Sequence, residues 1–374
     1  MRNKRIKRFR QHLHNAFQKF RLRYLQPGRL THFPDTLTIE LTSHCSLACS
    51  CCPNGIGGAR RRGRDTLSLD GFKRLLGNID VPVRRVFLHL HGEPFLNKDL
   101  PEIVGLLAER GIEEFNIFSN AYNISLDLLE KVLGSVGSKN LNLAFSAELY
   151  DRQAYEQIRC PGRFDQVWQS LQKIDEIMVK HGAAYSVNSI VRRENIGVLP
   201  ERVPGVFSRL KGLKSIHFTS AFPWPHLPQT GDLAGHLRRK RSICSQIWQL
   251  PAIMADGRVT MCSSDYNAEC AVGSLYEEKY SKIINNKAAR AFRRNIAMRR
   301  PESNALCNGC LIDRHTDFSR VVKRKFVEKA APEVLQKYFD AYSKYFQIDE
   351  EIFVQASAEP NLFGLCRAQP KITK

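Results

Sequence analysis

The stretch TIELTSHCSLACSCCPNG, residues 38–55, places four cysteines within eight positions directly after an apolar run. Three of them, Cys45, Cys49 and Cys52, have the spacing CxxxCxxC. Three thiolates on one short loop can each bind one iron of a cubane cluster and leave the fourth iron without a protein ligand. Zinc prefers four tetrahedral ligands, and four crowded cysteines make that geometry awkward. The spacing therefore favours a [4Fe–4S] cluster with one open iron.

The chain contains 374 residues and eleven cysteines, a number that needs an explanation. A secreted, disulfide-bonded protein is one explanation, but the number is odd and the N-terminus lacks the apolar core of a signal peptide. A redox-active CxxC pair would leave the other cysteines of the loop unexplained. No apolar run reaches the ~18 residues that a membrane-spanning helix needs. We therefore expect a cytoplasmic, metal-binding protein with one large domain or two.

Beyond the cysteine loop, strand-like runs alternate with helical patterns. Six strands separated by helices are typical of a parallel α/β sheet, which right-handed crossovers can wind open or curl toward a barrel. The predicted strands are residues 37–41, 85–90, 115–119, 141–146, 185–191 and 215–220. The predicted helices are residues 69–78, 100–111, 126–134, 151–158, 164–180 and 199–210.

Polar or ligating side chains follow the first four predicted strands. The cysteine loop follows the first strand, HGEP (91–94) the second, Ser119-Asn120 the third and Ser146 the fourth. The carboxyl ends of parallel strands lie on one face of the sheet, where such folds build their sites. We therefore expect these features to form one site. Glu148, just beyond the fourth strand, is a proton-acceptor candidate by position alone.

Three motifs together resemble the radical S-adenosylmethionine (SAM) superfamily. They are CxxxCxxC after the first strand, GEP (92–94) after the second, and the segment NLAFSAELYDRQAYEQIRCPGRFDQVWQSLQKI (142–174) around the fourth. The resemblance covers roughly residues 36–220. It implies a partial (β/α)6 TIM-like barrel. It also implies that the open iron chelates the amino and carboxylate groups of SAM, whose reductive cleavage gives methionine and a 5′-deoxyadenosyl radical.

The same resemblance implies residue roles. Glu93 would accept hydrogen bonds from the methionine ammonium, and Gly92, followed by Glu93 and Pro94, would let the backbone approach closely. Arg159 would pair with the methionine carboxylate. The remaining cofactor contacts, to the ribose or the methionine moiety, would come from Ser119, Asn120 and Ser146.

Two positions depart from the family pattern. Cys51 stands where an aromatic residue usually helps to cover the adenine, so we count it among the cofactor contacts. Cys51 could also replace Cys52 as a ligand, although Cys52-Pro53 matches the family better. His91 occupies a position where glycine is common, and it is either a core or a supporting histidine.

A second set of cysteines is similar to the C-terminal SPASM or twitch extension of that superfamily. Cys244 and Cys262 frame a hairpin signal at Asp256-Gly257, and Cys307-x2-Cys310 follows. By resemblance these four thiolates hold one fully ligated auxiliary [4Fe–4S] cluster. Zinc bound by the same four residues stays open, and Cys270 could replace one of them. The other cysteines, Cys160 and Cys366, are interpreted as ordinary thiols.

The charge is concentrated at the N-terminus. The net charge is +20, and residues 1–30 carry ten Lys and Arg, no acid and an apolar stripe. This helical extension could pack on the body, contact an anionic membrane through residues 1–25, or bind nucleic acid, for which no motif is present.

The predicted domains are residues 1–30 (basic amphipathic extension), 31–222 (radical SAM core), 223–325 (auxiliary cluster domain), and 326–374 (C-terminal helix and tail, with a helix predicted at 332–346).

A fully ligated auxiliary cluster is suited to taking up an electron. By resemblance we expect the oxidation of a small polar metabolite, such as a sugar or aminocyclitol. One alternative is the radical modification of a ribosomally made peptide, although thirty residues before the first strand are too few for the leader-binding domain that such enzymes often carry. Another is an iron–sulfur binding or electron-carrying module, which would have no use for a GEP motif.

The family receives electrons from flavodoxin or ferredoxin, which are usually acidic. Arg60, Arg61, Arg62 and Arg64 follow the cysteine loop and could offer such a partner a positive face. The same four arginines could instead form a solvated loop or clamp an anionic substrate.

Overall fold

The frame of the protein is one ten-stranded sheet with the order β10-β6-β5-β4-β3-β2-β1-β7-β8-β9. The computed structural model describes residues 28–30, 33–57, 59–191, 197–219, 221, 224–227, 244–308, 310 and 319–343. The amphipathic helix predicted for residues 1–30 lies almost wholly outside these ranges, as does Cys366.

Six neighbouring strands are parallel, as predicted. They are β1 (Thr36–Ile39), β2 (Arg85–Phe87), β3 (Glu114–Ser119), β4 (Leu141–Ser146), β5 (Tyr185–Ile190) and β6 (Leu213–Thr219). The second strand is shorter than the predicted range 85–90, because its ladder with β3 ends at Phe87.

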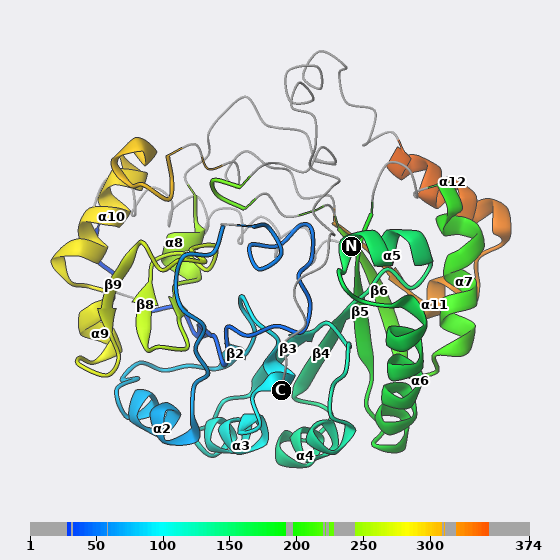
Figure 1. The fold of residues 1–374 in the computed structure, drawn as a ribbon, viewed down its shortest axis with the longest axis horizontal. Helices are drawn as coiled ribbons and strands as arrows, with labels where there is room; N and C mark the ends of the chain where they lie inside the picture. Colours follow the sequence, from blue (N-terminus) through cyan, green and yellow to red (C-terminus); the bar gives the residue numbers. More distant parts are fainter. Residues whose placement is uncertain are drawn as a thin grey trace, which may run out of the picture.

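Helices connect these strands and cover the convex face of the curved sheet (Figure 1). They are α2 (Leu69–Gly77), η2 (Pro94–Leu96), α3 (Leu100–Glu109), α4 (Leu126–Val136), α5 (Arg152–Ile158), α6 (Phe164–Lys180) and α7 (Leu199–Arg209). Side-chain caps start several of them: Ser68 accepts the Gly71 N–H, Ser125 the Leu128 N–H and Asp151 the Ala154 N–H. The sheet does not close, so the predicted partial barrel is confirmed.

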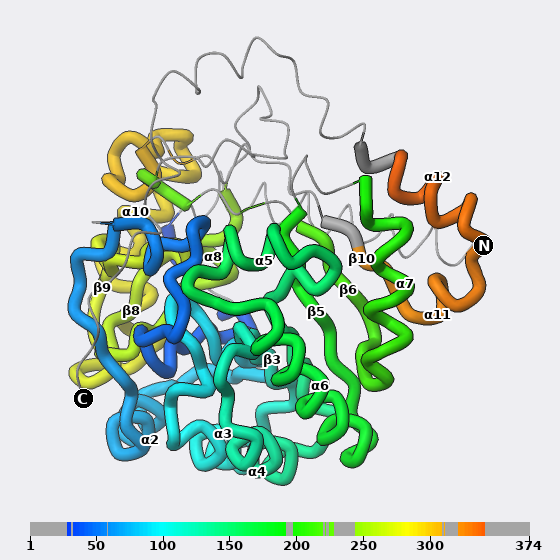
Figure 2. The backbone as a smooth tube through the Cα atoms, turned by 45° about the vertical axis from the view of Figure 1, so that its right-hand side comes forward, coloured from blue at the N-terminus to red at the C-terminus, as the bar shows by residue number. Residues whose placement is uncertain are grey.

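The C-terminal segments extend both ends of this sheet (Figure 2). At one end β7 (Ala252–Ile253) pairs in parallel with β1 and leads into antiparallel β8 (Arg258–Thr260) and β9 (Ala271–Ser274). At the other end β10 (Ser319–Lys323) runs antiparallel to β6. The remaining helices are α8 (Gln246–Gln249), α9 (Tyr280–Ile283), α10 (Lys287–Ala297), η4 (Pro301–Ser303), α11 (Arg324–Val327) and α12 (Pro332–Ser343).

The Asp256-Gly257 hairpin between β7 and β8 is confirmed. Gly257 has a φ of +81°, and an added Cβ would lie 2.5 Å from the Tyr276 ring, so glycine is required on both counts. The basic stretch 279–297 forms two helices, of which α9 ends at Ile283. Asn286 caps the second, α10, by accepting the Ala289 N–H.

The strands β5 and β6 have two chemically different faces. Their outward side chains are apolar or aromatic and buried beneath the helices: Tyr185, Val187, Ile216 and Phe218. Their inward side chains are mostly polar, Ser186, Asn188, Ser215, His217 and Thr219, together with the apolar Ile190. Because side chains alternate along a strand, outward packing fixes which residues face inward. Within the described ranges, none of the helices is long and apolar enough to cross a membrane.

Asp175 of α6 ties this helix to β5 and to the start of β6. Its buried carboxylate accepts hydrogen bonds from the Tyr185 hydroxyl (2.8 Å) and from the Lys211 and Gly212 N–H groups (both 2.7 Å). Each donor would be left unpaired away from water if the carboxylate were removed.

We expect Asp175→Ala to lower the free energy of unfolding by about 3 kcal/mol, because three buried donors lose their acceptor. Urea denaturation followed by circular dichroism measures the change. The matched control is Glu176→Ala, one position along the same helix and exposed to solvent. Equal stability of the two variants would contradict this account.

Candidate functional site

The loop after β1 brings Cys45, Cys49 and Cys52 together. It turns tightly, since the Cys52 N–H donates to the Cys49 carbonyl (3.0 Å) and the Gly55 N–H to the Cys52 carbonyl (2.9 Å). Burial raises the pKa of the Cys45 thiol to about 11, and the neighbouring Glu93 and Cys49 add to the rise. The pKa of Cys52 is raised by burial and by the same group of thiols. A bound metal offsets such costs, because it binds the thiolate form.

The HGEP turn after β2 packs directly onto this loop. The Glu93 N–H donates to the His44 carbonyl (2.8 Å). A Cβ on Gly92 would lie 2.1 Å from the Thr42 oxygen and 2.7 Å from the His44 oxygen. Only glycine allows two backbones to approach so closely, which is the predicted reason for Gly92.

Glu93 joins the ends of β2 and β3 to the cysteine loop. It is 2% exposed, and its carboxylate accepts the Phe95 N–H (3.1 Å) and the Asn120 N–H (2.7 Å). Burial raises the pKa of Glu93 to about 7, although these hydrogen bonds oppose the rise. The Asn120 amide in turn donates to Ser46 Oγ (3.1 Å) and lies 3.6 Å from Cys45 Sγ. The structure therefore brings Glu93 and Asn120 beside the predicted cluster ligands.

The two serines predicted as cofactor contacts lie at the ends of adjacent strands. Ser119 is buried at the end of β3, where its hydroxyl accepts the Ala121 N–H (3.1 Å) and so caps the turn. Ser146 is half-buried at the end of β4, in register with Asn188 of β5. Both lie at the carboxyl ends of their strands, as predicted, and their contacts with a cofactor stay predictions.

Glu148 forms a buried ion pair with Arg159. The guanidinium donates from Nε (3.0 Å) and Nη2 (2.8 Å) to the carboxylate, which also accepts the Ile190 N–H (3.0 Å). Both carboxylate oxygens of Glu148 are therefore engaged in hydrogen bonds, and its role as a proton acceptor stays a prediction. The pair also orients Arg159, whose Nη1 lies 4.0 Å from Cys49 Sγ. Nη1 is the atom through which Arg159 could still contact the predicted methionine carboxylate.

The second set of cysteines also gathers in one place. Burial raises the pKa of Cys262 to about 12, with contributions from Cys244 and Cys310. Burial also raises the pKa of Cys307, and the four other cysteines of the set, including Cys270, add to the rise. The Cys270 N–H donates to Asp265 Oδ2 (2.8 Å), which holds its backbone beside the hairpin. The four predicted ligands thus lie together, with Cys270 as a fifth neighbour.

Thiolates are the usual ligands of iron–sulfur clusters, and they also hold zinc. Within the described part of the chain, no three Cys, His, Asp or Glu side chains converge on one point as ligands of a single metal do. The thiolates of a cubane bind different irons, so they need not converge.

Two family models match the chain. Residues 39–195 match the radical SAM superfamily, and residues 244–311 match the SPASM iron–sulfur cluster-binding domain. By these matches the chain carries a radical SAM domain followed by a SPASM domain. A radical SAM domain carries a [4Fe–4S] cluster and SAM, and a SPASM domain carries auxiliary iron–sulfur clusters. The residues assembled here fit those groups by donor type and by close packing.

Curated relatives and solved structures agree with this assignment. The chain is 27% identical over 257 residues to the GTP 3′,8-cyclase of Vibrio atlanticus, covering 67% of this chain and 74% of the relative. It is 25% identical over 272 residues to the same enzyme of Shewanella denitrificans, covering 69% and 74%. It shares its fold with anSMEcpe bound to AdoMet, with a TM-score of 0.53 and 13% identity, covering 89% of this chain and 98% of that one.

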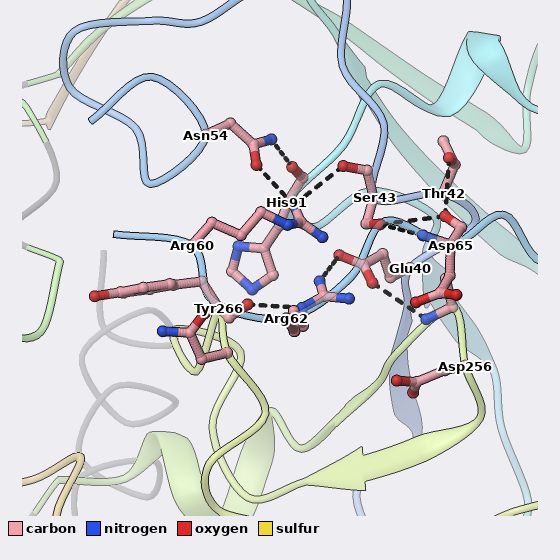
Figure 3. A network of polar contacts seen from close by, with 12 residues as sticks. Glu40, Thr42, Ser43, Asn54, Arg60, Arg62, Asp65, His91, Asp256 and Tyr266 are labelled. Carbon is pink, nitrogen blue, oxygen red and sulfur yellow. Dashed lines mark hydrogen bonds and ion pairs between the residues drawn. The ribbon is translucent and has the colours of Figure 1, made fainter. Parts of the chain in front are cut away.

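Two of the four arginines after the cysteine loop, Arg60 and Arg62, point inward, contrary to part of the docking prediction (Figure 3). The Arg62 side chain is 4% exposed and pairs with Glu40, which is fully buried. Arg62 Nε also donates to the Tyr266 carbonyl of the SPASM segment (2.7 Å). Glu40 in turn accepts the Ala255 N–H (3.1 Å), so the pair joins the radical SAM core to the SPASM hairpin.

The other arginines of this loop differ in their surroundings. Arg60 is partly buried and donates to Asn54 Oδ1 (2.6 Å) and to the Ser43 carbonyl (3.1 Å). Arg61 is 72% exposed and pairs with Glu269, and Arg64 is exposed. Arg60 and Arg62 are therefore excluded from a docking face.

An aromatic group also spans the two domains, and the sequence pattern did not predict it. The ring of His91 lies 5.5 Å from that of Trp224 and 6.4 Å from that of Tyr266. Trp224 Nε1 donates to the Cys51 carbonyl (2.9 Å), and the Tyr266 hydroxyl donates to the Pro225 carbonyl (3.1 Å). His91 is buried in this group, as expected for a supporting histidine.

We expect Cys52→Ala to lose the iron of the SAM-binding cluster and Cys51→Ala to retain it. The Cys51 backbone carbonyl, which the substitution keeps, anchors the loop to Trp224. Iron per protein and the electron paramagnetic resonance (EPR) signal after anaerobic reconstitution test this, with Cys160→Ala as the control. Loss of iron in Cys51→Ala alone would assign the third ligand to Cys51.

We expect Arg62→Ala to destabilise the protein by about 3–5 kcal/mol, because Glu40 would remain buried without its partner. Arg61→Ala, which removes an exposed pair, should cost less than about 1 kcal/mol. Chemical denaturation of both variants measures the difference. Comparable losses of stability in the two variants would show that the buried pair stabilises the protein no more than the exposed pair does.

Proposed function

We propose that this radical SAM enzyme oxidises an alcohol carbon of a small polar substrate to a carbonyl. The observation that carries the proposal is a hydrogen-bonding inner face on β5 and β6, in the same sheet that carries the two cysteine sites. The inner face of β5 and β6 is lined by serine, asparagine and histidine, which suit a substrate rich in hydroxyl groups.

The SPASM cysteines support an oxidative outcome. Cys244, Cys262, Cys307 and Cys310 lie together, enough to ligate every iron that needs a protein thiolate. A cluster ligated in this way has no iron open to substrate, so its role would be to accept an electron. That proposal requires four cysteine ligands, which iron analysis of the single variants can count.

The chemistry of the first site supplies the radical. When bound, the [4Fe–4S] cluster and SAM provide a 5′-deoxyadenosyl radical that removes a hydrogen atom from the substrate carbon. Glu93, through its carboxylate, and Arg159, through Nη1, would hold the amino acid part of SAM. In the overall balance, alcohol and SAM become carbonyl compound, methionine, 5′-deoxyadenosine and a proton, and the priming electron returns to the protein.

The electron donor is proposed to be an acidic flavodoxin or ferredoxin. Arg61 and Arg64 are the exposed members of the arginine loop, and they lie beside residues that contact the SPASM hairpin. Electrostatic attraction between such faces raises association rates at low salt.

A second candidate is the cyclisation of a purine nucleotide. The similarity to GTP 3′,8-cyclases over two thirds of the chain favours it. The two functions differ in electron balance. Oxidation returns its electron and can turn over many times for each reducing equivalent, whereas cyclisation leaves a product radical that must be reduced.

We expect deuterium to appear in 5′-deoxyadenosine when reconstituted protein, SAM and a limiting one-electron reductant are mixed with carbon-deuterated monosaccharides or aminocyclitols. Mass spectrometry measures the label and the carbonyl product. Product should exceed the reducing equivalents added, and Cys45→Ala should give none. Deuterium transfer from ribose-deuterated GTP to 5′-deoxyadenosine, with no carbonyl product from the monosaccharides or aminocyclitols, would contradict oxidation and favour nucleotide cyclisation.

A further inference from the structure

A row of polar side chains crosses the inner face of three strands. Ser146 of β4 is in register with Asn188 of β5, which is in register with His217 of β6. Neighbouring strands are about 4.8 Å apart, so His217 lies roughly 10 Å from Ser146 along this row. Ser146 ends β4 at the same edge of the parallel sheet as the cysteine loop that follows β1, and His217 lies two strands farther along the inner wall.

His217 belongs to a hydrogen-bonded series that runs down this wall. Its Nε2 lies 3.1 Å from Ser215 Oγ, which lies 3.0 Å from Ser186 Oγ. With Nε2–H donating to Ser215, and Ser215 donating to Ser186, Nδ1 carries a lone pair. In the described part of the chain, Nδ1 has no hydrogen-bond partner and the side chain is half-buried. The series therefore orients the ring while leaving one nitrogen available.

The other histidines of this region are less suited to accept a proton. His89 stacks on Phe118 with ring centroids 4.0 Å apart, and burial lowers its pKa to about 4. His91 is enclosed by Trp224 and Tyr266 at the SPASM interface. Glu148, the acid nearest to the end of β4, is occupied by Arg159.

We propose that His217 accepts the hydroxyl proton of the substrate radical during the oxidation. This inference rests on the proposed function and names a proton acceptor for it. Substrate would bind against the row of Ser146, Asn188 and His217, with the hydroxyl of its reacting carbon toward Nδ1.

The step balances in atoms and electrons. Removal of the C–H hydrogen leaves a carbon radical that still bears O–H. The O–H bond breaks as Nδ1 takes the proton, and the remaining electron would go to the oxidised iron–sulfur cluster that Cys244, Cys262, Cys307 and Cys310 would hold, which leaves a C=O double bond. The imidazolium formed is stabilised by its Nε2–H bond to Ser215, which donates onward to Ser186.

Burial lowers the pKa of His217, so the ring is neutral and able to accept a proton near pH 7. The groups that face it are uncharged: Asn188 from β5, Ser215 from β6 and Val321 from β10. Lys323 of β10 is opposite Ser215, and it is the charged residue on this face within the described parts of these three strands.

The test compares wild type with His217→Gln, using a carbon-deuterated aminocyclitol or monosaccharide that wild type oxidises. Glutamine can keep the bond to Ser215 but cannot take a proton at neutral pH. We expect carbonyl formation to fall at least about 100-fold, while deuterium still reaches 5′-deoxyadenosine. A substrate radical should accumulate in freeze-quenched EPR samples. The control is His181→Gln, at the end of α6, which should oxidise substrate normally.

The pH dependence gives a second readout. Wild-type carbonyl formation should fall as the pH drops through the pKa of His217, because protonation removes the acceptor lone pair. The residual rate of His217→Gln should lack this acid limb. A merely structural role would reduce deuterium transfer and carbonyl formation together and would keep the acid limb.

Each outcome decides the inference. Normal carbonyl formation by His217→Gln overturns it and leaves the proposed function intact. If wild type takes deuterium from none of the sugars or aminocyclitols, the proposed function fails and this inference falls with it. If His217→Gln melts well below wild type, His217→Asn with added imidazole replaces it, and failure of imidazole to restore carbonyl formation counts against proton acceptance.

Discussion

The buried pair of Glu40 and Arg62 holds the two cysteine sites in a fixed relation. Glu40 ends the first strand, Arg62 lies on the loop beyond the cluster cysteines, and their hydrogen bonds reach Ala255 and Tyr266 of the SPASM hairpin. Two ions withdrawn from water are costly unless each is fully satisfied. Burial raises the pKa of Glu40 and Arg62 opposes that rise, so each side chain depends on the other. Electron transfer between two clusters needs such a fixed separation.

The same loop couples metal binding to folding. Burial raises the pKa of Cys45, Cys49 and Cys52, so the apoprotein buries neutral thiols around a turn that Gly55 and Gly92 make narrow. Cluster insertion ionises these thiols and releases protons. The hydrogen bonds of Asn120 and the position of Arg159 then face sulfur that carries negative charge. The amide of Asn120 and the guanidinium of Arg159 interact weakly with a neutral thiol but favourably with the negatively charged sulfur of a cluster.

Local patterns predicted the strands, most helices and the first cysteine loop, because strand alternation, helical periodicity and CxxxCxxC spacing each extend over a few residues. The second cysteine set, spread from Cys244 to Cys310, was predicted only from the family resemblance. The arginine loop was different. From the sequence, Arg62 resembles an ordinary surface arginine. Only the fold brings it next to Glu40, which directly follows β1, and next to the distant Tyr266 carbonyl. The ion pair of Glu148 with Arg159 was likewise not predicted from the sequence. Neither pairing leaves a periodic signal, and nor does the joining of β7 to β1 across more than two hundred residues.

The packing of the outer face of the sheet determines which side chains lie on the inner face. Ile216 and Phe218 are packed under helices, with Phe218 5.9 Å from the ring of Phe339 on α12, so His217 between them must face inward. A slip of one residue would expose both apolar side chains and bury the imidazole, a cost that pins the register. The hydrophobic core therefore places an ionisable ring on the inner face of the sheet without any contact from the ring itself. Chemistry on this wall can change while the packing that positions it stays the same.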